Sequence, residues 1–342
     1  GWCGRTADPS GATVAGVTGP ITLPLPRRAL AAAWQRGIGP GPSGVDLVHA
    51  PTMFVPPARR GVPLVVTVHD AVPWTHPATL TPHGVRWHQA MGQRVARQAA
   101  AVIVPTRAVA AEIGPRLGIG DDRLHVIGEG VSAAVTTLPP DAAQRAVRLR
   151  LPADGYLLSL ATLEPRKGLD VALAALADPA SPGLPLLLVG AQGWGGLDPA
   201  AEAARRGLPP SAVRVLGRLP DADLAVVLAG ATALLMPSRA EGFGLPVLEA
   251  MACGVPAIIS DAPALVEVGG EAVVTVPVGD APALAAAIAA VAGDGKLRET
   301  LRMTGLARAK KFTWNAVAHE CWALYRRLTG VPASSERWGR RA

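Results

Sequence analysis

Short apolar runs of strand length alternate with helical stretches along most of this chain, and this alternation limits the possible folds more than any other feature. In the second half the runs are Tyr156–Leu160, Leu186–Val189, Val213–Leu216, Ala233–Met236, Ala257–Ser260 and Val273–Val276. The first half adds Val45–His49, Leu64–His69, Val102–Val104 and Leu124–Ile127. Strands that are apolar throughout, with helices between them, are typical of parallel sheets covered on both faces. The sequence therefore predicts an α/β fold with two doubly wound parallel-sheet, Rossmann-like domains.

The boundary between the two domains is expected in the polar, arginine-rich segment Pro139–Asp154, where no apolar strand is visible. We therefore predict a first domain over residues 1–150 and a second over residues 151–315, followed by a helix at 316–329 and a disordered tail at 330–342. Ligands of open α/β sheets bind beyond the carboxyl ends of the strands. We expect the two domains to face each other across a cleft and a ligand to bind in it.

Composition and cysteine usage exclude several classes of protein. Hydrophobic residues make up 49% and charged residues 17% of the chain, which fits a globular protein and not a disordered one. Apolar runs are far too short to span a membrane, and no signal peptide is visible, so we expect a cytoplasmic protein. Cys3, Cys253 and Cys321 are scattered without metal-ligand spacing, and we infer no disulfide.

Residues 238–254 carry the clearest chemical signal, with the sequence Ser-Arg-Ala-Glu-Gly-Phe-Gly-Leu-Pro-Val-Leu-Glu-Ala-Met-Ala-Cys-Gly. Glu241 and Glu249 bracket a glycine-rich turn that follows an apolar strand and opens a helix, with Pro246 predicted at the first helical position. The free amides at the start of this helix would bind phosphate. A diphosphate with a carboxylate at each end suggests a nucleotide-sugar. The alternative is a capped helix whose glutamates merely favour its dipole.

This segment resembles the Glu-x7-Glu signature of the retaining family 4 glycosyltransferases, which have the GT-B fold. The resemblance extends to Glu164-Pro-Arg-Lys-Gly168, Leu188-Val-Gly190, Val215-Leu-Gly217, Ser260-Asp261 and Glu267, and covers roughly residues 45–328. It implies that the first domain serves the acceptor, that the second binds the donor, and that the helix at 316–329 crosses back to the first domain. It also implies that Glu241 lies beside the donor hexose and that Glu249 holds the ribose.

Two further groups complete the predicted site. Lys167 and Arg166 follow an apolar strand, at the carboxyl edge of a sheet, and their positive charges would neutralise the donor diphosphate. His69 ends the run Leu64–His69 and matches a histidine that lies beside the transferred sugar in the family; the alternative is a structural histidine bonded to a carbonyl. The predicted catalytic residues are Glu241 and His69, and the predicted donor-binding residues are Lys167, Arg166, Gly242, Phe243, Gly244, Leu245 and Glu249.

The resemblance implies front-face transfer of a hexose from a nucleoside diphosphate sugar to an acceptor hydroxyl. The Glu-Pro-Arg-Lys variant of the motif resembles that of mannosyltransferases that use GDP-mannose, so the expected donor is mannose from GDP-mannose. We expect neither a metal nor another cofactor. The alternatives are a sugar synthase or phosphorylase of the same fold, a sugar-nucleotide epimerase, and an inactive, truncated homologue that acts as a scaffold or binds a membrane surface.

The first 44 residues depart from the family pattern. They show one weak strand, Ala12–Val17, and one plausible helix, Arg27–Arg36, where family members usually have a first strand, a glycine-rich loop and a long helix. The chain also begins at Gly1 and not at Met. Our hypothesis is that it lacks its native N-terminus or starts late, and that Gly1–Gly4 is a remnant of the glycine-rich loop.

The positive charge is unevenly placed. Residues 1–150 contain 15 arginines, no lysine and eight acidic residues, whereas the remainder contains 18 basic and 18 acidic residues, so the first part carries the whole net charge of +7. A basic acceptor domain would attract a phosphorylated acceptor or anionic lipid headgroups at the inner face of the membrane. The alternative is that the arginines are merely solvated. The predicted partners are a nucleotide-sugar and a glycan, lipid-linked or small-molecule acceptor, and no nucleic acid.

Overall fold

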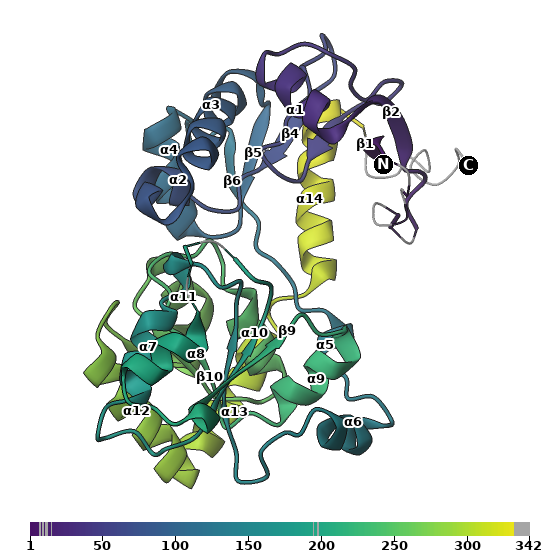
Figure 1. Ribbon diagram of the computed structural model, residues 1–342. Coiled ribbons are helices and arrows are strands. Elements are labelled where there is room, and N and C mark those ends of the chain that lie inside the picture. The colour runs from purple at the N-terminus through teal and green to yellow at the C-terminus, as the bar shows by residue number, and fades with distance from the viewer. Residues whose placement is uncertain are drawn as a thin grey trace. The chain divides into compact units, whose positions relative to one another are not determined.

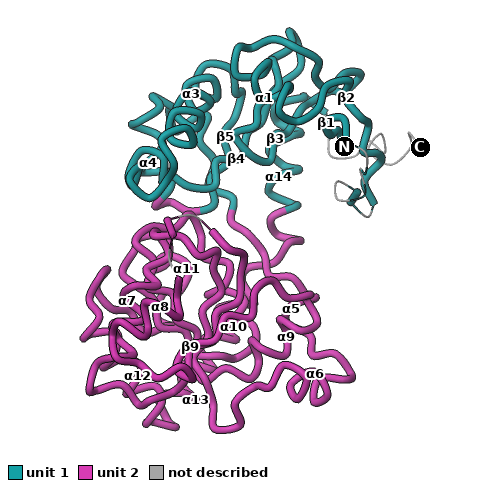
Figure 2. Tube along the Cα trace, in the orientation of Figure 1, with its two compact units in different colours: residues 1–105, 109–127, 318–342 teal, residues 106–108, 128–317 magenta. Residues whose placement is uncertain are grey.

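The computed structural model describes residues 1–331 except 7, 9, 11, 12, 15, 194 and 197 (Figure 1). Contacts divide the chain into two compact units (Figure 2). Unit 1 comprises Gly1–Pro105, Val109–Ile127 and the end of the chain from Ala318, and unit 2 comprises Thr106–Ala108 and Gly128–Val317.

Unit 2 contains a six-stranded parallel sheet in the order β12-β11-β10-β7-β8-β9. Its strands are β7 (Leu157–Leu160), β8 (Leu186–Val189), β9 (Val213–Gly217), β10 (Ala233–Met236), β11 (Ala257–Ser260) and β12 (Val274–Val276). Numbered along the chain within the unit, the spatial order is 6-5-4-1-2-3, which is that of a doubly wound nucleotide-binding sheet. The predicted doubly wound parallel sheet is therefore confirmed in unit 2.

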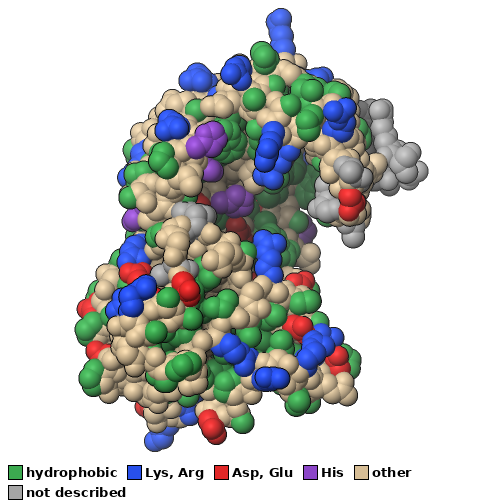
Figure 3. Space-filling view, in the orientation of Figure 1, with side chains coloured by type: hydrophobic (Ala, Val, Ile, Leu, Met, Phe, Trp, Pro, Cys, Tyr) green, Lys and Arg blue, Asp and Glu red, His purple; other side chains and the backbone are tan. Residues whose placement is uncertain are grey.

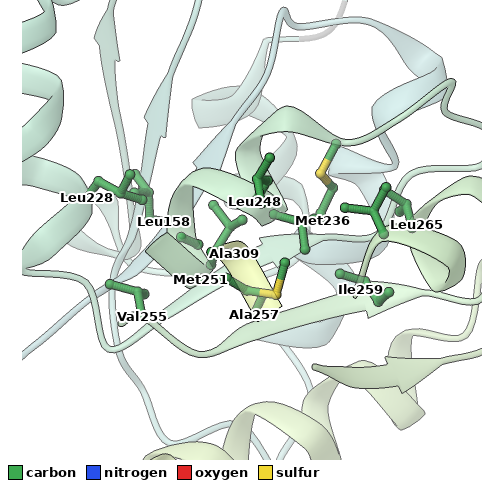
Figure 4. Packing of buried hydrophobic residues seen from close by; sticks show 14 of the residues in the cluster. Leu158, Leu228, Met236, Leu248, Met251, Val255, Ala257, Ile259, Leu265 and Ala309 are labelled. Carbon is green, nitrogen blue, oxygen red and sulfur yellow. The ribbon is translucent and has the colours of Figure 1, made fainter. Parts of the chain in front are cut away.

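In the four central strands of this sheet, β11, β10, β7 and β8, neighbouring residues point to opposite faces, and an apolar cluster covers each face. Leu158 belongs to one apolar cluster and Leu157 to another, and the same alternation is seen at Leu234 and Leu235. The helices of the unit are α5 (Ala133–Thr136), α6 (Ala142–Arg148), α7 (Leu169–Leu176), α8 (Pro199–Arg205), α9 (Asp221–Ala229), α10 (Leu245–Ala252), α11 (Pro263–Gly269), α12 (Ala281–Gly293) and α13 (Gly295–Ala309). Figure 4 shows the cluster that packs α10 onto the sheet through Leu248 and Met251.

The position where the strand order reverses lies between β7 and β10, which are paired neighbours. The chain runs from β7 toward one edge of the sheet and from β10 toward the other. Two loops therefore leave the same place at the carboxyl edge, one after β7 and one after β10. Ligands of doubly wound sheets bind at such a reversal.

Unit 1 contains a four-stranded parallel sheet whose strands follow chain order. They are β3 (Val48–Ala50), β4 (Leu64–Thr67), β5 (Ala101–Val104) and β6 (Leu124–Val126). The helices α2 (Val72–Thr75), α3 (Pro82–Gln98) and α4 (Arg107–Leu117) lie along the chain between them. Buried residues of α3 and α4, such as Met91 and Ile113, share one apolar cluster with strand residues. A separate parallel pair, β1 (Trp2–Arg5) and β2 (Ile21–Pro26), is followed by α1 (Arg27–Gln35).

The N-terminal region differs from two expectations. The predicted strand Ala12–Val17 is wrong for the residues of that segment that the structure describes, because Val14 and Val17 are exposed and lie outside any strand; Ala12 and Ala15 fall outside the described residues. The strand is instead Ile21–Pro26, which pairs with β1. That pairing also places Gly1–Gly4, predicted as a loop remnant, largely within a strand. The predicted helix over Arg27–Arg36 is confirmed as α1.

The chain passes from unit 1 to the long segment of unit 2 between Ile127 and Gly128, whereas the predicted boundary is at residue 150. Unit 2 begins at Gly128 because α5 and α6 pack on α9. Arg145 and Arg148 of α6 each lie 2.6 Å from the Asp223 carboxylate of α9, and these ion pairs link the arginine-rich segment to unit 2. The final helix, α14 (Trp314–Thr329), groups with unit 1 from Ala318 onward. The tail predicted at 330–342 lies outside the described residues from 332 on.

Candidate active site

The loop after β7 lies directly against the end of β10. Pro165–Lys167 forms a short 3-10 turn (η3), and Gly168 then adopts a left-handed conformation with φ +67°. A Cβ atom at Gly168 would lie 2.0 Å from the carbonyl oxygen of Pro237, so only glycine allows this approach. Gly168 therefore brings the side chains of the turn beside the segment that follows β10.

Four charged side chains alternate in sign between these two loops. Lys167 Nζ lies 2.7 Å from Glu241 Oε1, and a nitrogen of the Arg166 guanidinium lies 2.9 Å from Glu241 Oε2. The other end of the guanidinium lies 2.6 Å from Glu164 Oε1. The exposed fractions of these side chains lie between 5% and 15%. Two buried carboxylates and two cations thus form one neutral chain of ion pairs.

The charge state of Glu241 follows from these contacts. Burial opposes ionisation of its carboxyl group, but Lys167 and Arg166 outweigh that effect and hold the pKa below its ordinary value. Glu241 is therefore a carboxylate at neutral pH. An ionised carboxylate accepts hydrogen bonds and stabilises positive charge, which suits contact with a sugar whose anomeric carbon becomes cationic.

The start of α10 presents free amides beside this cluster. Gly244 has φ +101° and precedes the helix, which begins at Leu245, so Pro246 occupies its second position and not the predicted first. The backbone N–H groups of residues 242–245 donate no hydrogen bond to any of the described residues. The carbonyl of Gly242 accepts a hydrogen bond from Thr106, which belongs to the same unit. Phe243 is buried against Phe312. The free donors and the helix dipole together favour an anion.

Glu249 is the fifth residue of α10, about one turn from these amides. Its side chain is half-buried, and within the described part of the chain it has no hydrogen bond or ion pair. Burial, followed by the nearby Asp221 carboxylate, raises the pKa of Glu249. An uncompensated carboxylate in this position suits a ligand with hydroxyl donors, such as a ribose.

In unit 1, His69 lies just beyond the carboxyl end of β4. Its Nε2 atom is 2.8 Å from the carbonyl oxygen of Pro51, and its side chain is exposed. It lines a pocket of about 800 Å³ together with Arg27, Arg28, His83 and His88. His69 is therefore bonded to a backbone carbonyl, as in the alternative interpretation of a structural histidine, and it also lines a pocket. It belongs to a different unit from the ion-paired cluster.

Comparisons with known proteins decide the family. A model of the group 1 glycosyl transferases matches residues 142–308, and a model of glycosyltransferase family 4 matches residues 7–135. The O-antigen chain mannosyltransferase B of Escherichia coli is 32% identical over 272 residues, which is 78% of this chain and 71% of that protein. The D-inositol 3-phosphate glycosyltransferase of Jonesia denitrificans is 31% identical over 318 residues, which is 86% of this chain and 74% of that protein.

This chain is a family 4 glycosyltransferase.

The fold agrees with that of solved relatives. The structure of sucrose-phosphate synthase from Thermosynechococcus elongatus matches with a TM-score of 0.67 and 26% identity, covering 91% of this chain and 82% of that one. The GT-B fold predicted from the sequence is thereby confirmed. The roles of individual residues in this glycosyltransferase stay predictions.

The structure brings together most of the predicted donor residues of the glycosyltransferase. Glu241, Lys167 and Arg166 are in direct contact, and the free amides and Glu249 belong to the helix that follows. Two residues to which the sequence assigned no role also belong to this cluster. Glu164 is buried and holds Arg166, and Arg239 links the two loops. Both residues lie within charged motifs, which could have marked them as candidates in the sequence. Their partners could not be predicted, because these depend on the pairing of β7 with β10.

Two other features of the glycosyltransferase, Glu267 and a second pocket, have no assigned role in the reaction. Glu267 accepts hydrogen bonds from the backbone N–H groups of Arg107 and Ala108, each at 2.9 Å, and so caps a chain segment. A pocket of about 710 Å³ lies at the amino ends of the unit 2 strands, near Leu184, Thr232 and Pro256. That edge is opposite the candidate site, so we assign it no role in the reaction.

Two features are absent from the described residues. They contain no cluster of three or more histidine, cysteine, aspartate or glutamate side chains that could hold a metal ion. No helix in the described part of the chain is long and apolar enough to cross a membrane.

Proposed function

We propose that this enzyme transfers a hexose, with retention of configuration, from a nucleoside diphosphate sugar to an acceptor hydroxyl. The observation that carries the proposal is the neutral ion-pair chain through Glu241, beside the free amides of α10 and the unpaired Glu249. Mannose from GDP-mannose is the donor we favour. The Glu-Pro-Arg-Lys motif supports this choice, and so does the similarity to an O-antigen mannosyltransferase.

In the proposed complex the diphosphate lies at the amides of Phe243, Gly244 and Leu245. Lys167 leaves Glu241 and binds the phosphate oxygens, which neutralises the leaving group as charge builds on it. Glu249 accepts hydrogen bonds from the ribose hydroxyls, and Glu241 accepts one from the hexose. No divalent metal is part of this proposal, so transfer is expected to persist in EDTA.

The proposed reaction takes place on one face of the sugar. The bond between the anomeric carbon and the phosphate oxygen breaks, and a bond from the acceptor oxygen forms on the same face. The acceptor proton passes to the departing phosphate oxygen. The products are a glycoside of unchanged anomeric configuration and a nucleoside diphosphate.

For the acceptor we propose a phosphate-bearing molecule bound in the pocket that His69 lines. Arg27 and Arg28 at the start of α1 and His83 on α3 are exposed there, and Asp70 is the one acidic side chain among the described residues that line it. Basic side chains and histidines recur over the visible face of unit 1 (Figure 3). The names of relatives, a D-inositol 3-phosphate glycosyltransferase and a sucrose-phosphate synthase, also support this class.

The donor part of the proposal is tested by a thermal-shift panel of UDP, GDP, ADP and their sugars. A ligand at about 100 times its dissociation constant adds about 2.7 kcal/mol to stability. We expect a clear rise in melting temperature with one base, GDP being favoured. A panel in which no nucleotide stabilises the protein contradicts the proposal.

The acceptor part is tested by calorimetric titration of glucose 6-phosphate and glucose into the protein saturated with its nucleotide. We expect the phosphorylated probe to bind more tightly, and the double variant Arg27→Ala, Arg28→Ala to weaken its binding at least fivefold. Arg86→Ala is the matched control, since Arg86 is an exposed arginine of α3 that does not line the pocket. Equal binding of both probes contradicts the choice of acceptor.

A further inference from the structure

Two arginines connect the donor loops in opposite directions. Arg166, in the loop after β7, donates to the carbonyl of Ala240 at 2.8 Å and to Glu241 at 2.9 Å, both in the loop after β10. Arg239, in the loop after β10, donates to the carbonyl of Pro165 at 2.8 Å. It also forms a two-point ion pair with Asp170 at the start of α7, at 2.9 and 2.7 Å. Each loop therefore supplies one arginine that binds the other.

A backbone hydrogen bond joins the same two loops at the centre of this arrangement. The N–H group of Arg239 donates to the carbonyl oxygen of Arg166 at 2.8 Å. Because β7 and β10 pair through only Leu157 and Leu158 near their beginnings, the strand ladder does not reach these loops. Side-chain contacts and this one backbone bond thus set the distance between Glu241 and Lys167.

Arg166 and Lys167 differ in how firmly they are held. The Arg166 guanidinium bridges two carboxylates and a carbonyl, and removal of one member of a buried ion pair leaves an uncompensated charge at high cost. Among the described residues, the Lys167 ammonium group pairs with Glu241 alone, and it sits on a flexible stem with rotatable donors. If Lys167 turned to a diphosphate, Arg166 would therefore still pair with Glu241.

We propose that Arg166 and Arg239 are positioning residues that form a reciprocal clasp between the donor loops and hold Glu241 at a fixed place while Lys167 changes partner. The proposal rests on the proposed function and deepens it, since it divides the two cations of the Glu-Pro-Arg-Lys motif between two roles. Lys167 binds the diphosphate, and Arg166 stays with Glu241. Arg239 acts without touching the donor.

The test is the variant Arg239→Met, which keeps the apolar stem and removes the charge and its hydrogen bonds. Its matched control is Arg302→Met. Arg302 forms an equivalent two-point ion pair with Glu299 on α13, away from the site, and its exposed fraction of 45% is comparable with the 31% of Arg239. Partly exposed pairs of this kind contribute about 0–1 kcal/mol to stability, so both variants are expected to fold.

Three quantities are measured for each variant: nucleotide affinity, the rate of sugar release from the donor identified in the thermal-shift panel, and amide hydrogen exchange. A misplacement of about 1 Å costs on the order of 100-fold in rate. We expect Arg239→Met to lower the rate 10- to 100-fold, to change nucleotide affinity less than threefold, and to speed exchange at residues 238–245. Arg302→Met is expected to change none of these.

A second pair of variants tests whether the two arginines act together. Because the clasp is one unit, the rate loss of the double variant Arg166→Met, Arg239→Met is expected to be smaller than the product of the two single losses. A wild-type rate in Arg239→Met overturns the proposal, and so do strictly multiplicative losses. If the wild-type protein binds no nucleotide, the proposed function fails, while the exchange data still show whether Arg239 holds the loops.

Discussion

Two glutamates eight residues apart experience opposite environments. The cations Lys167 and Arg166 keep the pKa of Glu241 low despite its burial, whereas burial and Asp221 raise the pKa of Glu249. Groups whose surroundings move their pKa values apart usually have different tasks. Glu241 suits constant negative charge beside a developing cation. Glu249 suits a binding role in which the hydroxyl groups of a ligand donate hydrogen bonds to its carboxylate.

The first prediction concerns Glu249→Gln. Each charge-assisted hydrogen bond to the ribose is worth about 1.5–3 kcal/mol, so the nucleotide dissociation constant is expected to rise about tenfold or more. Calorimetric titration with the preferred nucleotide measures it. An unchanged dissociation constant would mean that Glu249 does not hold the ribose.

Nucleotide affinity is also expected to depend on pH through Glu249. Because its pKa is raised, the carboxylate becomes protonated at a higher pH than an ordinary glutamate does, and the charge-assisted bonds weaken as pH falls through that value. The wild-type protein should therefore lose affinity on mild acidification. In Glu249→Gln this loss should be absent, and the same slope in both proteins would contradict the assignment.

The second prediction concerns Glu241→Gln, which keeps the shape of the side chain and removes its charge. We expect a large drop in turnover and a loss of stability of about 1–3 kcal/mol, since two buried cations lose a partner. The pKa of Glu241 is lowered in the folded protein, so its stabilisation is present above the ordinary carboxyl pKa and is lost as pH falls through the folded value. Urea unfolding at several pH values measures both. Normal turnover would remove Glu241 from the site.

Among the elements of unit 1, α14 is held by a partly buried polar contact. His49, in β3, lies 2.5 Å from the Tyr325 hydroxyl of α14 and 2.8 Å from the Thr67 hydroxyl of β4. Burial, with a smaller contribution from His69, lowers the pKa of His49 to about 4. His49 is therefore a neutral hydrogen-bonding residue at neutral pH, and it joins three elements of unit 1.

The third prediction is that Tyr325→Phe destabilises the protein by about 1–3 kcal/mol, because it leaves one nitrogen of the partly buried His49 side chain without a partner. Asn315→Ala, an exposed position of the same helix, is the control and should be close to neutral. Chemical unfolding measures the difference, and hydrogen exchange should show α14 opening more readily. Equal stability of the two variants would rule out the contact as a support for α14.

Elements whose signals are local could be predicted from the sequence. The strand, turn and helix around Glu241 are where the pattern puts them, since an apolar run, two glycines and a proline define them within a few residues. The grouping of α5 and α6 with unit 2 could not be predicted, because it depends on ion pairs to Asp223, far along the chain. The β1–β2 pair also depends on contacts between separate segments.

The site shows the same division. Glu241, Lys167 and the free amides follow from motifs, whereas the roles of Glu164 and Arg239 depend on which strands are neighbours. The sequence shows charged residues in both loops, but it does not show that the arginine of each loop binds the other loop. That fact depends on the strand order of unit 2, in which β7 and β10 are adjacent.

At the scale of the whole molecule, the net charge of +7 resides in residues 1–150. Clustered basic side chains attract anionic surfaces, and the attraction weakens over a Debye length of about 10 Å at 0.1 M salt. The fourth prediction is that the protein co-sediments with phosphatidylglycerol vesicles at low salt and is released at high salt. Neutral phosphatidylcholine vesicles are the control. No binding at low salt would mean that the arginines are merely solvated.

A crystal structure with the preferred nucleotide-sugar shows whether an activated sugar binds where the loops after β7 and β10 meet. We expect diphosphate oxygens within hydrogen-bonding distance of the amides of residues 243–245 and of Lys167 Nζ, with the ribose on Glu249. We also expect Arg166 to remain in contact with Glu241. A donor bound elsewhere, or Glu249 pointing away from the ribose, would contradict these expectations.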